Sequence, residues 1–326
     1  MASPYKILGV GSPILDILVN VDESFLRHVP GAKGGMELVD QKTIANILAQ
    51  TTGSPLQAPG GSAANTIYAL SKLGVATGLL GKLADDDNGK FYLKNYAAAG
   101  GDTSRIKKSA TTPTGTCLCL VTPDSQRTMR TCLGAAADMT LDDVTPDDFR
   151  GYTHAHVEGY MLFNKPLTAK ILDLATKAGL TISLDLSSFE VVRANKDTLG
   201  TLIEKHVDIL FANEDEAKEY LGRHDPEAFI NTFKDVCDIV AVKLGKDGAI
   251  VKTPSEKARI SAMTVDAIDT TGAGDLWQAG FLYGLLKGKP LETCGHYAAI
   301  LGAEIVTVMG AHLSEDAWRK IISRLA

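Results

Sequence analysis

The sequence has no long uncharged apolar run, and this absence excludes a membrane-spanning helix, which needs about 18 to 20 such residues. The apolar N-terminal segment is interrupted by Pro13 and Asp16 and lacks a cleavage site, so we interpret it as a buried strand rather than a signal peptide. Basic residues are not in excess, since 33 Lys and Arg face 39 Asp and Glu, a net charge of −6. Nucleic acid and anionic membranes are therefore not expected partners.

Cysteine is scarce and irregularly spaced. The five cysteines are odd in number and no pair has C-x-x-C spacing, which argues against a zinc ribbon, a redox dithiol and a disulfide framework, and predicts a reducing, cytoplasmic location. Cys117 and Cys119 would share one strand face and pack there. His154 and His156 lack a third ligand at suitable spacing, so we interpret them as core or surface residues rather than a metal site.

Two common nucleotide-binding fingerprints are missing. The pattern G-x-G-x-x-G begins at Gly9, but Ile14 stands where the third glycine is needed. This substitution disfavours an NAD-dependent oxidoreductase. No G-x-x-x-x-G-K-[ST] string occurs, so a P-loop nucleotide site is excluded at the level of the motif.

The order of apolar segments predicts an α/β fold. Short apolar runs alternate with segments of helical period along the 326 residues, as in a mostly parallel sheet flanked by helices. Two regions, about 14–40 and 112–133, break this alternation, and the second reads as a hairpin turning at Pro123 and Asp124. We expect residues 1–326 to form one domain in which these two regions build a small β-sheet lid. The expected strands are 7–10, 76–80, 155–158, 181–185, 209–212 and 239–243, and the expected helices are 63–73, 89–99, 166–177, 196–205, 214–221 and 226–235.

The string Asp269-Thr-Thr-Gly-Ala-Gly-Asp275 is the most informative one in the chain. Its turn of small residues opens a helix that runs to about Leu286, and successive backbone N–H groups at a helix start can hold a phosphate or an oxyanion. Asp275 beside such a nest would repel the anion, so its simplest purpose is to take a proton from a hydroxyl nucleophile. For a lone G-x-G-D, a tight turn followed by a first-turn acid is the better explanation, and the longer string 269–275 shifts the balance toward an anion site.

Three further polar strings lie at the ends of expected strands or the starts of helices. Gly60-Gly61-Ser62-Ala63-Ala64-Asn65 precedes a helix, with Ser62 as the expected N-cap. Asp16 interrupts an apolar segment; it should not be buried without a partner, and its two oxygens suit neighbouring sugar hydroxyls as well as a backbone N–H or a salt bridge. Asn213 and Glu216 fit a capping box, yet they also follow a strand, where open α/β sheets bind ligands. The segment 242–249 reads as an ordinary hairpin.

Taken together, these strings resemble the ribokinase/PfkB-type family of sugar and nucleoside kinases over essentially the whole chain. The string 269–275 is similar to the family's C-terminal signature, 60–65 to its Gly-Gly signature, and Asn213 with Glu216 to its N-x-x-E motif. Gly11-Ser-Pro-Ile-Leu-Asp16 and Pro113-Thr-Gly-Thr-Cys117 look like the adenosine kinase branch. That branch has Asn-Pro where this chain has Ser12-Pro13, and its base-stacking phenylalanine is replaced near Tyr160.

The resemblance implies a ribokinase-like fold and transfer of the γ-phosphoryl group of ATP, with Mg²⁺, to a primary alcohol. The acceptor would be an adenosine-like nucleoside or, alternatively, a sugar, as in ribo- and fructokinases. A non-catalytic ligand-binding protein on the same scaffold is a third reading, but its expected mark, loss of Asp275 or the glycines, is absent. The resemblance also allows a monovalent cation beside the Asp269 loop. An exposed edge of the lid sheet could pair with a second subunit, so both a monomer and a homodimer through the lid stay open.

The resemblance assigns roles to residues of this sequence. Asp275 would be the catalytic base and Gly272, Ala273 and Gly274 the anion hole. Acceptor binding falls to Asp16, Gly60, Gly61 and Asn65, with Arg127 reaching from the lid toward the phosphates. Glu216 would hold Mg²⁺ through water, and the ATP site would be formed by Asn213, Glu216, Lys243, Gly245, Thr271 and Gly310.

Overall fold

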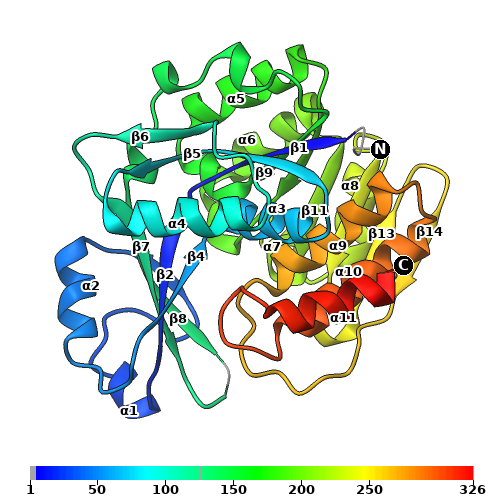
Figure 1. Ribbon diagram of the computed structural model, residues 1–326. Coiled ribbons are helices and arrows are strands. Elements are labelled where there is room, and N and C mark those ends of the chain that lie inside the picture. Colours follow the sequence, from blue (N-terminus) through cyan, green and yellow to red (C-terminus); the bar gives the residue numbers. More distant parts are fainter. Residues whose placement is uncertain (1–4, 125, 326) are drawn as a thin grey trace.

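The larger of two β-sheets forms the centre of the molecule (Figure 1). The computed structural model describes residues 5–124 and 126–325. The sheet has nine strands in the order β14-β13-β12-β11-β10-β9-β1-β5-β6. Neighbours from β6 to β12 run parallel, whereas the β12–β13 and β13–β14 pairs are antiparallel. The strands are β1 (Lys6–Val10), β5 (Ala76–Ala84), β6 (Ile106–Ser109), β9 (His154–Glu158), β10 (Thr181–Asp185), β11 (Ile209–Asn213), β12 (Ile239–Lys243), β13 (Ala249–Lys252) and β14 (Lys257–Ile260).

Helices cover both faces of this sheet, because its inner strands are apolar on both sides. One face packs against α5 (Lys165–Lys177), α6 (Phe189–His206), α7 (Glu214–Leu221) and α8 (Pro226–Phe233). The other packs against α3 (Ser62–Lys72), α4 (Asp87–Ala98), α9 (Ala273–Leu286), α10 (Leu291–Ile305) and α11 (Glu315–Leu325). The predicted α/β architecture with a mostly parallel sheet flanked by helices is confirmed.

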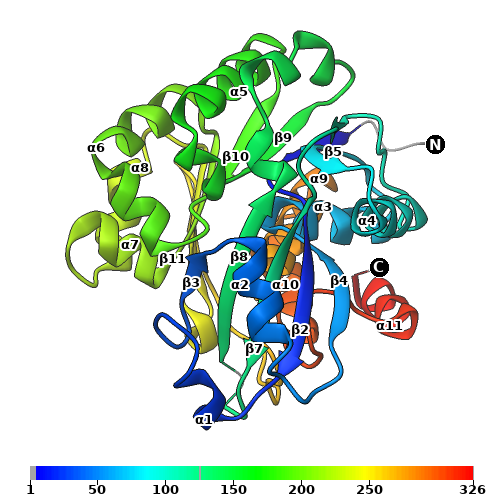
Figure 2. The same cartoon turned by 90° about the vertical axis from the view of Figure 1, so that its left-hand side faces the viewer.

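A second, smaller sheet lies beside the first and packs on its outer side against α2 (Figure 2). Its strand order is β3-β8-β7-β2-β4. The two segments expected from the sequence supply β2 (Ile14–Asn20), β3 (Met36–Leu38), β7 (Thr114–Val121) and β8 (Arg127–Gly134), with the short helices α1 (Glu23–Leu26) and α2 (Gln41–Leu48) between them. The hairpin of β7 and β8 turns where expected, and Ser125 lies outside the described residues.

The fifth strand of the small sheet, β4 (Leu56–Gly60), was not predicted. It contains Pro59 and ends on Gly60, two residue types that weaken a strand pattern, and it is tolerated because it is an edge strand. Helix α6 begins at Phe189, seven residues before the predicted start, because the Ser188 side chain caps it by accepting from the Val191 N–H. In the described part of the chain, the longest apolar helical stretches fall short of what crossing a bilayer requires.

Candidate active site

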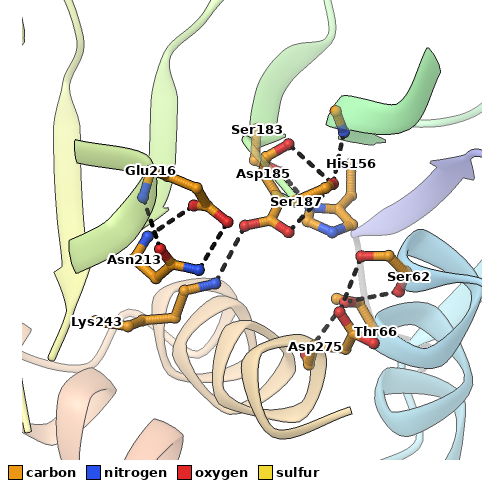
Figure 3. Close-up of polar contacts among 11 residues, drawn as sticks. Ser62, Thr66, His156, Ser183, Asp185, Ser187, Asn213, Glu216, Lys243 and Asp275 are labelled. Carbon is orange, nitrogen blue, oxygen red and sulfur yellow. Dashed lines mark hydrogen bonds and ion pairs between the residues drawn. The ribbon is translucent and has the colours of Figure 1, made fainter. Parts of the chain in front are cut away.

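Polar side chains gather where the parallel strands of the large sheet end. Glu158 closes β9, Asp185 closes β10, Asn213 closes β11 and Lys243 closes β12. The ends of parallel strands meet at one edge of a sheet, which is where open α/β folds bind ligands. Figure 3 shows Asp185, Asn213, Glu216 and Lys243 on one side of this edge and Asp275, Ser62 and Thr66 on the other.

Asp275 lies in the first turn of α9 and is held there by α3. Its Oδ1 accepts a hydrogen bond from the Ser62 hydroxyl at 2.9 Å and its Oδ2 accepts one from the Asn65 amide at 2.9 Å. The Thr66 hydroxyl donates to the Asp275 main-chain carbonyl at 3.1 Å. Burial raises the pKa of the Asp275 carboxyl to about 6, while the Asn65 hydrogen bond opposes the rise. The carboxylate is thus fixed in position and ionised near neutral pH.

The structure corrects the predicted role of Ser62. The N-cap of α3 is Gly61, and Ser62 is the first helical residue, so its hydroxyl is free to bind Asp275. Gly61 has φ 104°, and a Cβ there would lie 2.5 Å from the Ser12 carbonyl oxygen. Glycine is required because the chain must pass this close to the loop after β1.

The turn that opens α9 leaves backbone donors free at the helix start. Among the described residues, the N–H groups of Gly272, Gly274 and Asp275 have no hydrogen-bond acceptor, whereas Ala273 donates to the Thr270 carbonyl at 3.2 Å. Gly272 has φ 73°, and a Cβ there would meet the Ala311 Cβ at 2.8 Å. Gly274 faces the Lys243 ammonium, which would lie 3.1 Å from an added Cβ. The glycines therefore leave room for an anion beside a cation.

Asp269 fastens this turn to the loop after α10. Its buried carboxylate accepts from the Thr271 N–H at 2.9 Å, the Thr271 hydroxyl at 2.7 Å and the Gly310 N–H at 2.7 Å. Arg127 of β8 lies 4.0 Å away. Thr271 and Gly310, expected at the ATP site, thus both anchor to Asp269.

The buried carboxylates of Asp185 and Glu216 and the partly buried Lys243 form a charge cluster opposite α9 (Figure 3). The Lys243 ammonium lies 3.1 Å from Asp185 Oδ1. Burial raises the pKa of Glu216, and the nearby Asp185 carboxylate raises it further. Two hard oxygen donors that repel one another suit Mg²⁺, so the residues present fit that ion. The predicted capping box is also found, because the Asn213 and Glu216 side chains each accept from the other's backbone N–H.

Asp16 lies in β2, close enough to Arg127, Asp275 and Asp269 for their charges to act on its carboxyl. It is 6% exposed, and no group of the described residues donates a hydrogen bond to it. The expectation that Asp16 needs a partner, whether within the chain or from ligand hydroxyls, stays a prediction. Burial raises its pKa to about 7, and the charge of Arg127 opposes the rise. Gly60 makes this position possible, because a Cβ there would lie 2.3 Å from Asp16 Oδ1. An unpaired buried carboxylate is ready to accept from ligand hydroxyls.

Glu158 was missed by the sequence interpretation. Its carboxylate is 1% exposed and accepts from the Ser12 N–H at 2.8 Å and from the Ala63 N–H at 3.0 Å. It therefore ties the loop that leads to Asp16 to the start of α3, which holds Asp275. Glycine at position 11 leaves room for it, since a Cβ there would lie 2.2 Å from Glu158 Oε2. The signal in the sequence was an acid that closes an apolar strand and directly precedes Gly159.

Gly245 belongs to a turn, whereas His154 and His156 belong to the core of the fold. Gly245 lies in the β12–β13 turn with φ 53°. His154 and His156 are both buried and share the Ser183 hydroxyl at 2.8 Å. Burial lowers the pKa of each to about 3, so both are neutral core residues.

Comparison with known proteins gives similarity over nearly the whole chain. The model of the pfkB family carbohydrate kinase matches residues 37–318. The ATP-dependent ribose-1-phosphate kinase of Halopiger xanaduensis is 30% identical over 300 residues, which cover 91% of this chain and 90% of that protein. A probable sugar kinase from Rhizobium etli CFN 42 superimposes with a TM-score of 0.89 at 28% identity, covering 99% of both chains. Adenosine kinase from Sinorhizobium meliloti also gives 0.89, at 29% identity, covering 98% of this chain and 99% of the other.

Proposed function

Since the chain belongs to the pfkB family of carbohydrate kinases and is an ATP-dependent sugar or nucleoside kinase, we propose that its acceptor is a ribose-containing compound with a free primary hydroxyl. Two similar proteins are named for their acceptors, ribose 1-phosphate and adenosine, and both of these compounds contain a ribosyl group. A pair of neighbouring ring hydroxyls also matches what the two oxygens of Asp16 can accept.

The observation that carries the proposal is the position of the Asp275 carboxylate beside free amides at the start of α9. Asp275 would take the proton of the acceptor hydroxyl as that oxygen attacks the terminal phosphorus of ATP. The N–H groups of Gly272 and Gly274 would stabilise the charge that develops on the transferring group. A base with a pKa of about 6 is ionised at neutral pH and still accepts a proton readily.

The charge cluster at the strand ends would serve the phosphates of ATP. Lys243 would neutralise phosphate oxygens from its place against Gly274. Glu216, with Asn213, and Asp185 would hold Mg²⁺, which when bound neutralises charge on the phosphates. Gly245, Thr271 and Gly310 would border the nucleotide as parts of the surrounding turns.

The second sheet would act as a lid over the acceptor, built from about 14–40 and 112–133 together with β4. Several contacts join it to the core of the fold. Arg127 approaches Asp269, His312 Nε2 lies 2.7 Å from the Pro59 carbonyl oxygen, and Leu18 packs against Gly310. A lid in this position excludes water, which would otherwise accept the phosphoryl group.

Two smaller proposals accompany this one. The exposed side chains Leu38 and Leu56 lie on β3 and β4, the edges of the small sheet, so a homodimer would form there if the enzyme is not a monomer. A cytoplasmic location would supply ATP and keep the five free cysteines reduced.

The test is an acceptor panel in which ADP release is measured with MgATP. Adenosine, other nucleosides, ribose 1-phosphate, ribose and fructose are compared at equal concentration. We expect kcat/KM to be highest for a ribosyl compound bearing a substituent at the anomeric carbon. Turnover of free hexose alone, with every ribosyl compound inert, would overturn the choice of acceptor class and support the alternative sugar kinase.

A further inference from the structure

Two thiols and a carboxylate meet on the inner face of the small sheet. Cys117 and Cys119 alternate with outward residues of β7, so both point to the same side, and their sulfur atoms lie 3.6 Å apart. Asp16 of β2 pairs with Cys117 across the sheet. One oxygen of Asp16 and the two sulfur atoms all lie within 4.8 Å of one another, and all three side chains are buried.

The spacing of the sulfur atoms suits a bridging metal ion better than a disulfide. Tetrahedral zinc binds sulfur at about 2.3 Å, so two thiolates on one zinc ion lie roughly 3.7 to 3.8 Å apart. The 3.6 Å between Cys117 and Cys119 is close to this value. A disulfide needs about 2.05 Å, a large approach for two residues of one strand that is paired on both sides.

The surroundings also favour a cation. The Asp16 carboxylate is 6% exposed and has no hydrogen-bond donor among the described residues, so a positive ion would satisfy a buried acceptor. The Thr131 hydroxyl donates to Cys117 Sγ at 3.2 Å, the kind of outer contact that orients a metal ligand. Two sulfur donors and one oxygen select a thiophilic ion such as Zn²⁺ over Mg²⁺, which prefers oxygen alone.

We propose that Cys117, Cys119 and Asp16 form an inhibitory site for Zn²⁺ or a similar thiophilic divalent cation. Binding replaces the two thiol protons by two metal–sulfur bonds, and both protons leave to solvent. The ion occupies Asp16, so it competes with the acceptor hydroxyls for this carboxylate and weakens acceptor binding. The inhibitory half of this inference rests on the proposed function, whereas the binding half does not.

The binding half is tested by titrating the protein with Co²⁺ as a spectroscopic stand-in for Zn²⁺. Thiolate-to-Co²⁺ charge-transfer absorption should appear in the wild type and disappear when Zn²⁺ is added. The band should be lost in Cys119→Ala and kept in Cys132→Ser, whose thiol lies on β8 beside the outer cluster. Absence of the band in the wild type, or its survival in Cys119→Ala, would overturn the site. Cys117→Ser gives the same decision if Cys119→Ala does not fold.

The inhibitory half is tested by steady-state kinetics at a fixed excess of MgATP. Zn²⁺ should raise the KM for the acceptor without lowering kcat, and Cys119→Ala should need about tenfold or more Zn²⁺ for the same effect. Inhibition that does not compete with the acceptor, or that is equal in Cys119→Ala and the wild type, would overturn it. If no acceptor is phosphorylated at all, the proposed function fails while the Co²⁺ spectrum still decides the metal site.

Discussion

At the scale of single residues, Asp275 has two features that a general base needs. Two side-chain donors from α3 fix its orientation, and burial places its pKa at about 6. Both features depend on residues far away in the sequence, so the motif 269–275 alone indicated the base but not what tunes it.

Replacing Asp275 by Asn should keep the fold and remove the base. We expect kcat to fall by about 10² to 10⁴ while the melting temperature and the affinity for ATP stay close to those of the wild type. Asp87→Asn, an exposed first-turn acid of α4, is the matched control and should leave kcat unchanged. Near wild-type turnover by the Asp275 variant on the best acceptor would end the assignment.

The pH dependence of kcat/KM should report the same group. The base works only when ionised, so the rate should fall about tenfold per pH unit below pH 6 and level off above it. Ser62→Ala removes a hydrogen bond that lowers the pKa of Asp275. The acid limb, the part of the pH profile in which kcat/KM falls, should therefore move up by about one pH unit. Thr66→Val removes a bond to the main-chain carbonyl instead. An equal movement of the limb in both variants would contradict this account.

At the scale of elements, the start of α9 requires glycine at position 272 for two reasons, a positive φ and the contact with Ala311. Gly288, just after the same helix, has φ 65° and nothing within 4 Å of an added Cβ. Gly288→Ala should therefore cost only backbone strain, about 1 to 2 kcal/mol of unfolding free energy. Gly272→Ala should cost about 1 to 3 kcal/mol more because the Ala311 contact is added.

Urea unfolding measures both glycine variants, and ATP binding separates them further. Gly272→Ala should weaken ATP binding because it disturbs the free amides, whereas Gly288→Ala should leave ATP binding as it is. An equal loss of unfolding free energy in the two variants would mean that Ala311 moves aside without an energetic penalty.

Elements were predictable where a local pattern decides them, and less so where distant contacts do. The strands that end in Glu158, Asp185 and Lys243 are apolar runs and were recognised. Edge strand β4 was not, because its pairing with β2 rather than its composition makes it a strand. At the site, the glycine turns and Asn213 carry local signals, whereas the roles of Glu158 and Ser62 arise only from the packing of β9 and α9 against α3.

At the scale of the whole molecule, one of the polar contacts between the small sheet and the core of the fold joins Arg127 to Asp269, 4.0 Å apart. Arg127→Gln should loosen this closure and admit water. We expect the amount of ADP released per phosphorylated acceptor to rise above one, measured by quantifying both products in the same reaction. Arg259→Gln, on the opposite edge strand β14, is the control and should keep the ratio at one. A ratio that stays at one in the Arg127 variant would show that this contact does not seal the site.

Glu158 has a consequence for how such an enzyme could change its substrate. One carboxylate bonds both Ser12, just ahead of the strand that carries Asp16, and Ala63, at the start of the helix that orients Asp275. Exchanging β7 and β8 for strands of another kinase would change the inner face of the small sheet and leave the contacts of Glu158 in place. The acceptor preference could then change, in evolution or by design, while Asp275 keeps its position.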